Sequence, residues 1–181
     1  ISMLIDLAQA TLLVVDIQEK LVPAVLNSEA HVQRVGWLLD VARDMDLPVV
    51  FSEQYPAGLG ATLPVLRQRV PTAPVVEKLH FSCVAGQCLP DSLLARPQVL
   101  LVGMEAHVCV LQTALELKAL GKDVFVVADC ITSRAQIDLD TALIRYQQEG
   151  VRLVTREMVL FELLRASGTP LFRQMSKQYL R

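Results

Sequence analysis

The chain has 181 residues, of which 52% are hydrophobic and 20% are charged, and its mean hydropathy is +0.40. This length suits one domain with a sizeable core, and the composition is too apolar for a disordered chain. The formal net charge is −2 and the Lys and Arg residues are scattered along the sequence, so we expect no nucleic-acid partner.

Apolar runs typical of buried strands alternate with stretches of helical periodicity along the chain. Ser28 is predicted to cap the first helix, and Trp37 lies on the apolar stripe of that helix, where we expect it to be part of the core. In chain order, the patterns predict a strand at 11–17, a helix at 28–45, a strand at 48–53, a loop at 54–64, a strand at 73–78, a loop with a short helix at 82–97, a strand at 98–104, a helix at 108–121 closed by Gly121, a strand at 123–129, a helix at 136–150 ending in Gly150, a strand at 151–155, and a mostly helical tail from 157 to 181 with a break near 167–170.

Six short apolar strands separated by helices favour a parallel sheet with helices on both faces. We therefore predict one doubly wound α/β domain over residues 1–181, with strand order 3-2-1-4-5-6. No apolar run approaches the ~20 residues that cross a bilayer, because Asp, Glu, Lys or Pro interrupts each one, so we expect no membrane segment.

The first residues, ISMLIDLAQ, lack the basic start, long apolar stretch and cleavage site of a signal peptide. The four cysteines lack CxxC spacing and are too sparse for a disulfide scaffold. Both observations lead us to expect a protein of the reducing cytoplasm. The four are Cys83, Cys88, Cys109 and Cys130.

Chemistry in such a sheet is expected outside the carboxyl ends of the strands. A carboxylate, an ammonium group and a thiol could converge along that edge, which is the strongest functional inference that the topology alone allows. The residues at the six strand ends are, in chain order, Asp16, Ser52-Glu53-Gln54, Lys78, the stretch from Met104 to Cys109, Asp129 and Thr155.

Cys109 is the first candidate nucleophile. A free cysteine is often only a small buried hydrophobe, but Cys109 lies in the first turn of a predicted helix, where free N–H groups favour a thiolate. His107 is two residues away and does not face Cys109 on a helix. We therefore expect His107 to be a residue of the helix entry and the base for Cys109 to come from elsewhere.

Asp16 and Lys78 complete a chemically coherent set with Cys109. An Asp after a strand is usually a turn or cap residue, and a Lys at a strand end is commonly a surface residue. Asp16, however, lies between apolar residues, where a buried carboxylate is costly unless paired. Lys78 could supply that pairing and favour the thiolate, while Asp16 takes the thiol proton and returns it to a leaving group.

Other signals are weaker. The glycines at 58 and 60 lack the third glycine and strand–helix context of a dinucleotide fingerprint, so we predict a loop there and no cofactor. The three histidines show no metal-ligand spacing, so no metal site is expected. Asp129 is predicted to be a turn residue.

Several segments resemble the isochorismatase-like cysteine hydrolases along nearly the whole chain, in the order and with the separations of that family. The resemblance is strongest to the small single-domain subgroup that includes the vertebrate isochorismatase domain-containing proteins. The matching segments are LLVVDIQEKLVPAV (12–25), FSEQYPAGLGATLPVL (51–66), VVEKLHFSC (75–83), LLVGMEAHVCVLQTAL (100–115), VFVVADCITSR (124–134) and GVRLVTREMVLFELL (150–164).

The resemblance implies a catalytic triad that falls on Asp16, Lys78 and Cys109. It also implies a cis peptide bond between Met104 and Glu105, with the backbone N–H groups of Glu105 and Cys109 forming an oxyanion hole. The implied mechanism is attack of Cys109 on an amide or related carbonyl, followed by hydrolysis of a thioester. Relatives commonly form homo-oligomers, and the substrate pocket is expected around Gln54, Tyr55 and Phe81, with a neighbouring subunit.

Departures from two subfamilies narrow the expected activity. Nicotinamidases carry an Asp-x-His metal-binding stretch where this chain has Ser52-Glu53-Gln54, and true isochorismatases do without the nucleophilic cysteine that Cys109 represents. These differences favour hydrolysis of a small amide or related C–N bond. The alternative is a catalytically idle, oligomeric binding or scaffold protein that keeps the fold.

Overall fold

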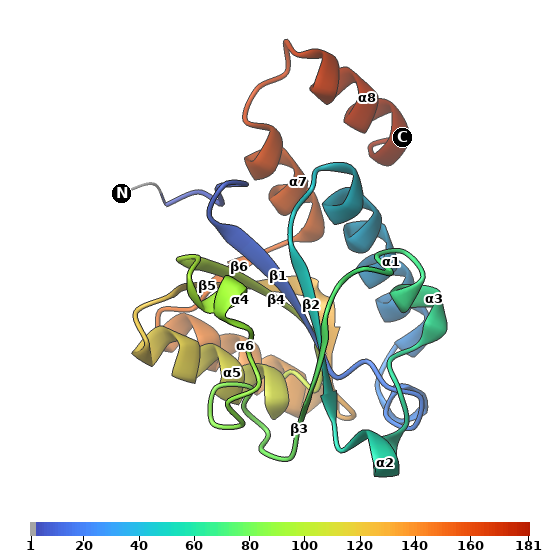
Figure 1. Cartoon of the computed structure of the whole chain (residues 1–181), viewed down its shortest axis with the longest axis vertical. Helices are drawn as coiled ribbons and strands as arrows, with labels where there is room; N and C mark the ends of the chain where they lie inside the picture. The colour runs from blue at the N-terminus through green and yellow to red at the C-terminus, as the bar shows by residue number, and fades with distance from the viewer. Residues whose placement is uncertain (1–2) are drawn as a thin grey trace.

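The structure, a computed structural model that describes residues 3–181, contains a six-stranded parallel sheet in the order β3-β2-β1-β4-β5-β6 (Figure 1). Every neighbouring pair of strands is parallel. The predicted strand order and the parallel sheet are therefore confirmed. The strands are β1 (Ala10–Val15), β2 (Val49–Gln54), β3 (Val75–Lys78), β4 (Gln98–Met104), β5 (Asp123–Thr132) and β6 (Arg152–Val154).

Helices cover both faces of this sheet, with α1 and α7 on one face and α5 and α6 on the other (Figure 1). The helices are η1 (Val22–Ala24, a short 3-10 helix), α1 (Ser28–Asp44), α2 (Pro56–Leu59), α3 (Pro64–Arg67), α4 (Asp91–Leu94), α5 (Cys109–Ala119), α6 (Gln136–Gln148), α7 (Arg156–Leu164) and α8 (Pro170–Tyr179). No helix in the described range 3–181 is both long enough and apolar enough to cross a membrane.

Strand β1 shows why the strands are apolar throughout. Leu12 and Val14 pack into the core under α1 and α7, whereas Leu13 and Val15 pack into the second core under α5 and α6. Successive side chains of a strand point to opposite faces, so a strand that is covered on both sides must be apolar at every position.

Strand β5 is longer than predicted and continues through Asp129 to Thr132. Leu101 of β4 pairs with Val126, but Gly103 pairs with Ile131, so β5 accommodates extra residues between these two pairs. The prediction of a turn at Asp129 is wrong. Its carboxylate instead accepts the backbone N–H of Arg156 at 2.9 Å and holds the first residue of α7.

The start of α1 and the predicted loop at 54–64 also differ from expectation. Asn27, not Ser28, precedes the helix, and it adopts a left-handed conformation (φ 50°) that asparagine tolerates better than most residues. The segment 54–64 contains α2 and the start of α3, each of which begins with a proline at its first position. Proline is preorganised for that position, although it also marks loops.

Trp37 is half-buried and packs at the edge of the core. Its ring makes an edge-to-face contact with Tyr179 at 5.6 Å, and the guanidinium of Arg156 lies 5.3 Å from the ring centre. Trp37 therefore packs against the core from a partly buried position and joins α1 to α7 and α8.

His31 on α1 is buried and makes stability depend on pH. Its Nε2 lies 2.9 Å from the carbonyl oxygen of Cys130, and its Nδ1 has no hydrogen-bond partner within residues 3–181. Burial lowers the pKa of His31 from 6.5 to about 4. The unfolded chain therefore takes up a proton at a higher pH than the folded chain does.

As the pH falls from 6.5 towards 4, we expect protonation of His31 in the unfolded chain to lower the free energy of unfolding by up to about 3 kcal/mol. The contribution of His31 to stability is fully present above the unfolded pKa of 6.5 and is lost as the pH approaches the folded pKa of about 4. Urea denaturation of the wild type and of His31→Gln, measured between pH 7 and 4.5, checks this. The variant should be less stable at pH 7 but should lose less stability on acidification. Equal losses in the two proteins would assign the acid sensitivity to other groups.

Candidate active site

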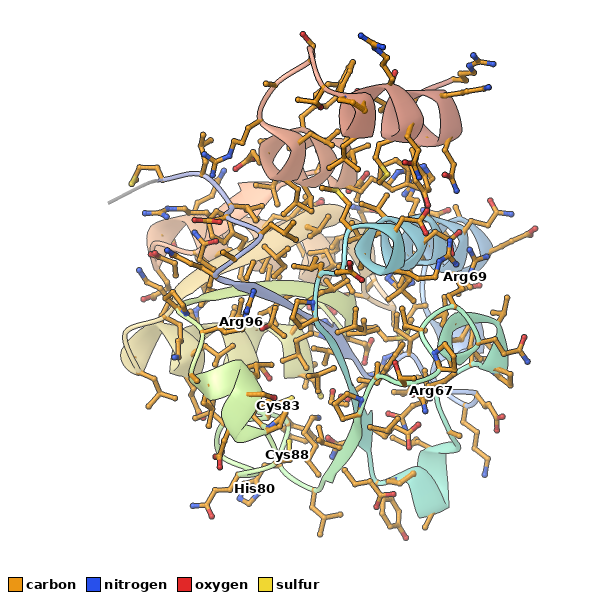
Figure 2. All side chains as sticks on the ribbon, turned by 45° about the horizontal axis from the view of Figure 1, so that its top comes forward. Arg67, Arg69, His80, Cys83, Cys88 and Arg96 are labelled. Atoms are coloured by element: carbon orange, nitrogen blue, oxygen red, sulfur yellow. The ribbon has the colours of Figure 1, made fainter. Side chains whose placement is uncertain are left out.

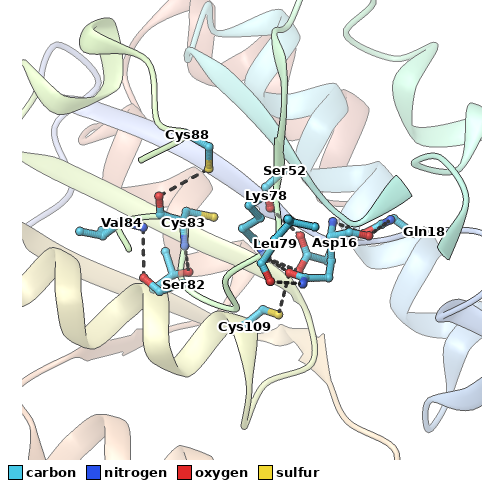
Figure 3. Close-up of polar contacts among 12 residues, drawn as sticks. Asp16, Gln18, Ser52, Lys78, Leu79, Ser82, Cys83, Val84, Cys88 and Cys109 are labelled. Atoms are coloured by element: carbon cyan, nitrogen blue, oxygen red, sulfur yellow. Dashed lines mark hydrogen bonds and ion pairs between the residues drawn. The ribbon is translucent and has the colours of Figure 1, made fainter. Parts of the chain in front are cut away.

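Asp16 follows β1 directly and is fully buried, with a left-handed backbone (φ 52°). One carboxylate oxygen accepts a hydrogen bond from the Ser52 hydroxyl at 2.8 Å, and the other accepts one from Lys78 Nζ at 2.8 Å (Figure 3). Because β2 lies between β1 and β3, Ser52 supports the carboxylate from the adjacent strand. The carboxylate is therefore held in place by two donors.

Lys78 ends β3, and its ammonium group is buried against Asp16 and Gln54. Nζ donates to Gln54 Oε1 at 2.6 Å as well as to Asp16. Burial is the largest single influence on the pKa of Lys78 and would lower it, but the charge and hydrogen bond of Asp16, together with the neighbouring Cys109 and Cys83, raise the pKa above its usual value. Lys78 is therefore a charged partner of Asp16 and not a surface lysine.

Cys109 is the first residue of α5, and its Sγ lies 3.9 Å from Gln54 Oε1. Burial and then the Asp16 carboxylate raise the pKa of this thiol to about 12, and Lys78 only partly opposes them. Lys78 therefore favours the thiolate, as predicted, but burial and the Asp16 carboxylate outweigh it. In the resting site, the neutral thiol lies beside an Asp16–Lys78 ion pair.

Two glutamines organise this cluster. The Gln18 side chain accepts the Gln54 backbone N–H at 2.7 Å and donates to the Gln54 carbonyl at 2.9 Å and to the Gly60 carbonyl at 2.8 Å. The Gln54 amide donates to the Leu79 carbonyl at 2.8 Å, which leaves Oε1 directed at Lys78 and Cys109. Gln54 was predicted as a pocket residue, whereas no sequence pattern pointed to Gln18.

The last three residues of β2 alternate between the two faces of the sheet. Ser52 and Gln54 contact Asp16 and Lys78, whereas the Glu53 carboxylate accepts the N–H (2.6 Å) and the hydroxyl (2.7 Å) of Thr62. Glu53 therefore holds the following loop and takes no part in the cluster. Within residues 3–181, no group of three or more His, Cys, Asp or Glu side chains is placed to hold a metal ion.

The backbone near Cys109 presents two N–H groups without partners. The peptide bond between Met104 and Glu105 is cis, and in the described part of the chain the N–H groups of Glu105 and Cys109 form no hydrogen bond. The Glu105 carboxylate is occupied by the backbone N–H (3.1 Å) and the guanidinium (2.9 Å) of Arg134. Glu105 therefore offers the site its N–H and not its carboxylate.

His107 joins the helix entry to the segment after β5. Its Nδ1 lies 2.9 Å from the Ser133 hydroxyl, and its Nε2 lies 3.7 Å from the Asp138 carboxylate. Within residues 3–181 it has no hydrogen bond to Cys109, so it is not placed to act as the base for that thiol.

The remaining predicted pocket residues, Tyr55 and Phe81, are about half exposed, at 53% and 51%. Tyr55, Lys78 and Leu79 help to line a cavity of about 400 Å³, but Phe81 is not among its lining residues. Leu79 is even more exposed, at 74%. We call these three exposed hydrophobic side chains, which follow Gln54 of β2 and Lys78 of β3 in the chain, the apolar rim.

The Isochorismatase domain family matches residues 10–158. Isochorismatase domain-containing protein 2A of Mus musculus is 39% identical over 165 residues, which cover 90% of this chain and 78% of that protein. The MAR1 ribonuclease of Caenorhabditis elegans superposes with a TM-score of 0.90 at 35% identity, covering 98% of this chain and 92% of that one.

The YcaC gene product of Escherichia coli, described as an octameric hydrolase of unknown specificity, superposes with a TM-score of 0.86 at 25% identity. The superposition covers 98% of this chain and 97% of that one. The fold and the family support a hydrolase-type function. The chain belongs to the isochorismatase family.

Proposed function

We propose that this protein is a cysteine-dependent hydrolase that cleaves a small amide or a related C–N or acyl bond. The observation that carries the proposal is the buried cluster of Asp16, Lys78 and Cys109. Lys78 contacts both Asp16 and Gln54 Oε1, and the Cys109 thiol contacts the same Gln54 oxygen. A buried carboxylate beside a thiol at a helix N-terminus is the arrangement that general-base activation of a nucleophile requires.

The raised pKa of Cys109 decides how the thiol reacts. With a pKa of about 12, forming the thiolate at pH 7 without a base costs about 7 kcal/mol. We therefore infer that Asp16 accepts the thiol proton as sulfur attacks the carbonyl carbon. Lys78 donates a hydrogen bond to Asp16 and offsets the charge of the buried carboxylate.

The subsequent steps use the same groups. The N–H groups of Glu105 and Cys109 bind the developing oxyanion, and each such donor typically contributes about 3 kcal/mol of barrier lowering. Asp16 returns its proton to the leaving nitrogen as the C–N bond breaks, which leaves a thioester on Cys109. A water molecule, deprotonated by Asp16, then hydrolyses the thioester and restores the thiol.

We also propose that the protein forms homo-oligomers. The exposed rim of Tyr55, Leu79 and Phe81 is apolar, and the Escherichia coli relative is described as octameric. A second copy covering this rim would enclose the site and complete its pocket. Light scattering of the purified protein tests the assembly, and a monomer at all concentrations would rule it out.

The hydrolase proposal is tested by screening wild type and Cys109→Ala against small aliphatic and aromatic amides, with a ureide and an RNA oligonucleotide included. We expect wild type to hydrolyse at least one small amide and Cys109→Ala to fall to the uncatalysed rate. Intact-protein mass spectra should show an acyl adduct on wild type but not on the variant.

Cys130→Ala is the matched control, because Cys130 is also a buried free cysteine but lies outside the cluster. It should retain the wild-type rate. If Cys109→Ala kept the wild-type rate, the nucleophile would be misassigned. If wild type hydrolysed none of the panel, the idle binding or scaffold protein would become the better description.

A further inference from the structure

Cys83 and Cys88 lie side by side in the loop between β3 and α4 (Figures 2 and 3). The Cys83 carbonyl accepts the backbone N–H of Cys88 at 3.4 Å and its thiol at 3.5 Å. With this N···O distance, covalent geometry keeps the two Cα atoms within about 7 Å, at the upper end of the separations that a disulfide spans. The backbone reversal therefore brings the two cysteines close enough for a small movement of the loop to join their sulfurs.

This turn is held in place by α5. The Ser82 hydroxyl accepts the N–H groups of Val84 (3.1 Å) and Ala85 (3.3 Å) and donates to the Glu116 carboxylate at 2.8 Å. The N–H of Cys83 donates to the Thr113 hydroxyl at 3.0 Å. The approach of the two cysteines is therefore part of an ordered structure.

The two thiols are not equivalent. Cys83 is fully buried, whereas Cys88 is half-buried. A hydrogen bond from the Cys83 thiol lowers the pKa of Cys88, and the same bond, with burial, raises the pKa of Cys83. Cys88 is thus the more accessible and more acidic thiol, and Cys83 is the neutral thiol behind it.

We propose that Cys83 and Cys88 form an oxidisable dithiol, which hydrogen peroxide converts to a disulfide within the loop. In the first step, the Cys88 thiolate attacks a peroxide oxygen, the O–O bond breaks, and hydroxide leaves and is protonated. Cys88 is then a sulfenic acid. In the second step, the sulfur of Cys83 attacks that of Cys88, the S–O bond breaks, and water leaves with the thiol proton. Two thiols are oxidised and one hydrogen peroxide is reduced to two water molecules.

The location places this dithiol next to the proposed active site. Gly86, in the same turn, lies so close to Lys78 that an added Cβ would be 3.1 Å from the Lys78 Cβ. The disulfide would fix the turn that packs against Lys78. This modification is separate from the hydrolase chemistry, since neither step uses Asp16 or Cys109.

The experiment uses Cys109→Ala as the background, so that the proposed nucleophile cannot exchange with the pair. The 181-residue protein is treated with hydrogen peroxide, quenched with catalase, alkylated with iodoacetamide after unfolding in urea, and digested with a protease that cleaves before aspartate. The fragment 46–90 then contains Cys83 and Cys88 and no other cysteine.

We expect this fragment to escape alkylation, to be lighter than the reduced fragment by two hydrogen atoms, and to become alkylated after dithiothreitol. Cys88 should be oxidised at least about tenfold faster than the buried Cys130. In Cys83→Ala, Cys88 should accumulate as a sulfenic acid that dimedone traps, whereas Cys88→Ser should leave Cys83 alkylatable after unfolding.

Three results would overturn the proposal. The first is alkylation of both cysteines at peroxide doses that oxidise Cys130. The second is oxidation of Cys88 to sulfinic acid while Cys83 stays free in the otherwise intact pair. The third is dimedone labelling of Cys83 in Cys88→Ser at the rate of Cys88 in Cys83→Ala, which would remove the proposed order of attack.

Discussion

Replacing Asp16 with asparagine is expected to lower the rate of amide hydrolysis by about 10³-fold and to make Cys109 react faster with iodoacetamide. Hydrolysis fails because asparagine cannot accept the thiol proton. Alkylation accelerates because the Asp16 charge, which helps to raise the pKa of Cys109 to about 12, is lost while the Lys78 ammonium remains. Opposite changes in the two rates are the signature of a base that also suppresses the thiolate.

Both rates should be measured between pH 6 and 10, after circular dichroism has established that the variant is folded. Asp129→Asn is the matched control, because Asp129 is a carboxylate of β5 that binds Arg156 and not the cluster. That variant should leave both rates unchanged. If Asp16→Asn slowed both alkylation and hydrolysis, Asp16 would promote formation of the Cys109 thiolate. That result would contradict the effect expected from the charge of Asp16.

The approximate location of the site follows from the sequence because it depends on topology. Parallel strands bring their carboxyl ends to one edge, so Asp16 and Lys78 are expected there once β1 and β3 are recognised as strands. The strands themselves are recognisable because burial on both faces makes them apolar throughout. Neither inference needs a side-chain distance.

The arrangement within the site could not be predicted in this way. Gln18 and Gln54 hold the cluster through their amide groups, and a glutamine has no periodic or local pattern that distinguishes such a role from a surface position. The extra residues of β5 are explained by the shift in its pairing with β4 between Leu101 and Gly103, and that shift is visible only in the folded sheet. Such features depend on contacts between segments far apart in the chain.

The pKa of Cys109 shows how a local rule can fail. The helix N-terminus favours a thiolate, but this effect typically contributes about 1 kcal/mol, whereas full burial can shift a pKa by several units. Cys109 is only 7% exposed and lies beside a carboxylate. Burial and the neighbouring charge therefore prevail, and both depend on tertiary structure that the local sequence does not reveal.

Gly103→Ala is expected to destabilise the fold by at least about 4 kcal/mol, which is exceptional for one methyl group. Gly103 has φ +120°, and a Cβ at this position would lie 2.1 Å from the Val15 carbonyl oxygen and 2.8 Å from the Val15 nitrogen. These are backbone atoms of β1, which is paired with β2 on one side and β4 on the other. Neither strand can retreat without breaking its pairing with its neighbours.

Two further glycines separate the clash from the backbone strain. Gly121 has φ +86° with nothing within 4 Å of an added Cβ, so Gly121→Ala should cost only the strain, about 1–2 kcal/mol. Gly168 has open space and no left-handed backbone, so Gly168→Ala should change stability by no more than about 0.5 kcal/mol.

Urea denaturation should show the largest loss of unfolding free energy for Gly103→Ala, a smaller loss for Gly121→Ala and the smallest for Gly168→Ala. A loss at Gly103 no larger than that at Gly121 would mean that β1 and β4 can separate locally. Because Gly103 leads directly into Met104 and Glu105, such freedom would also make the backbone donors of the proposed site poorly fixed.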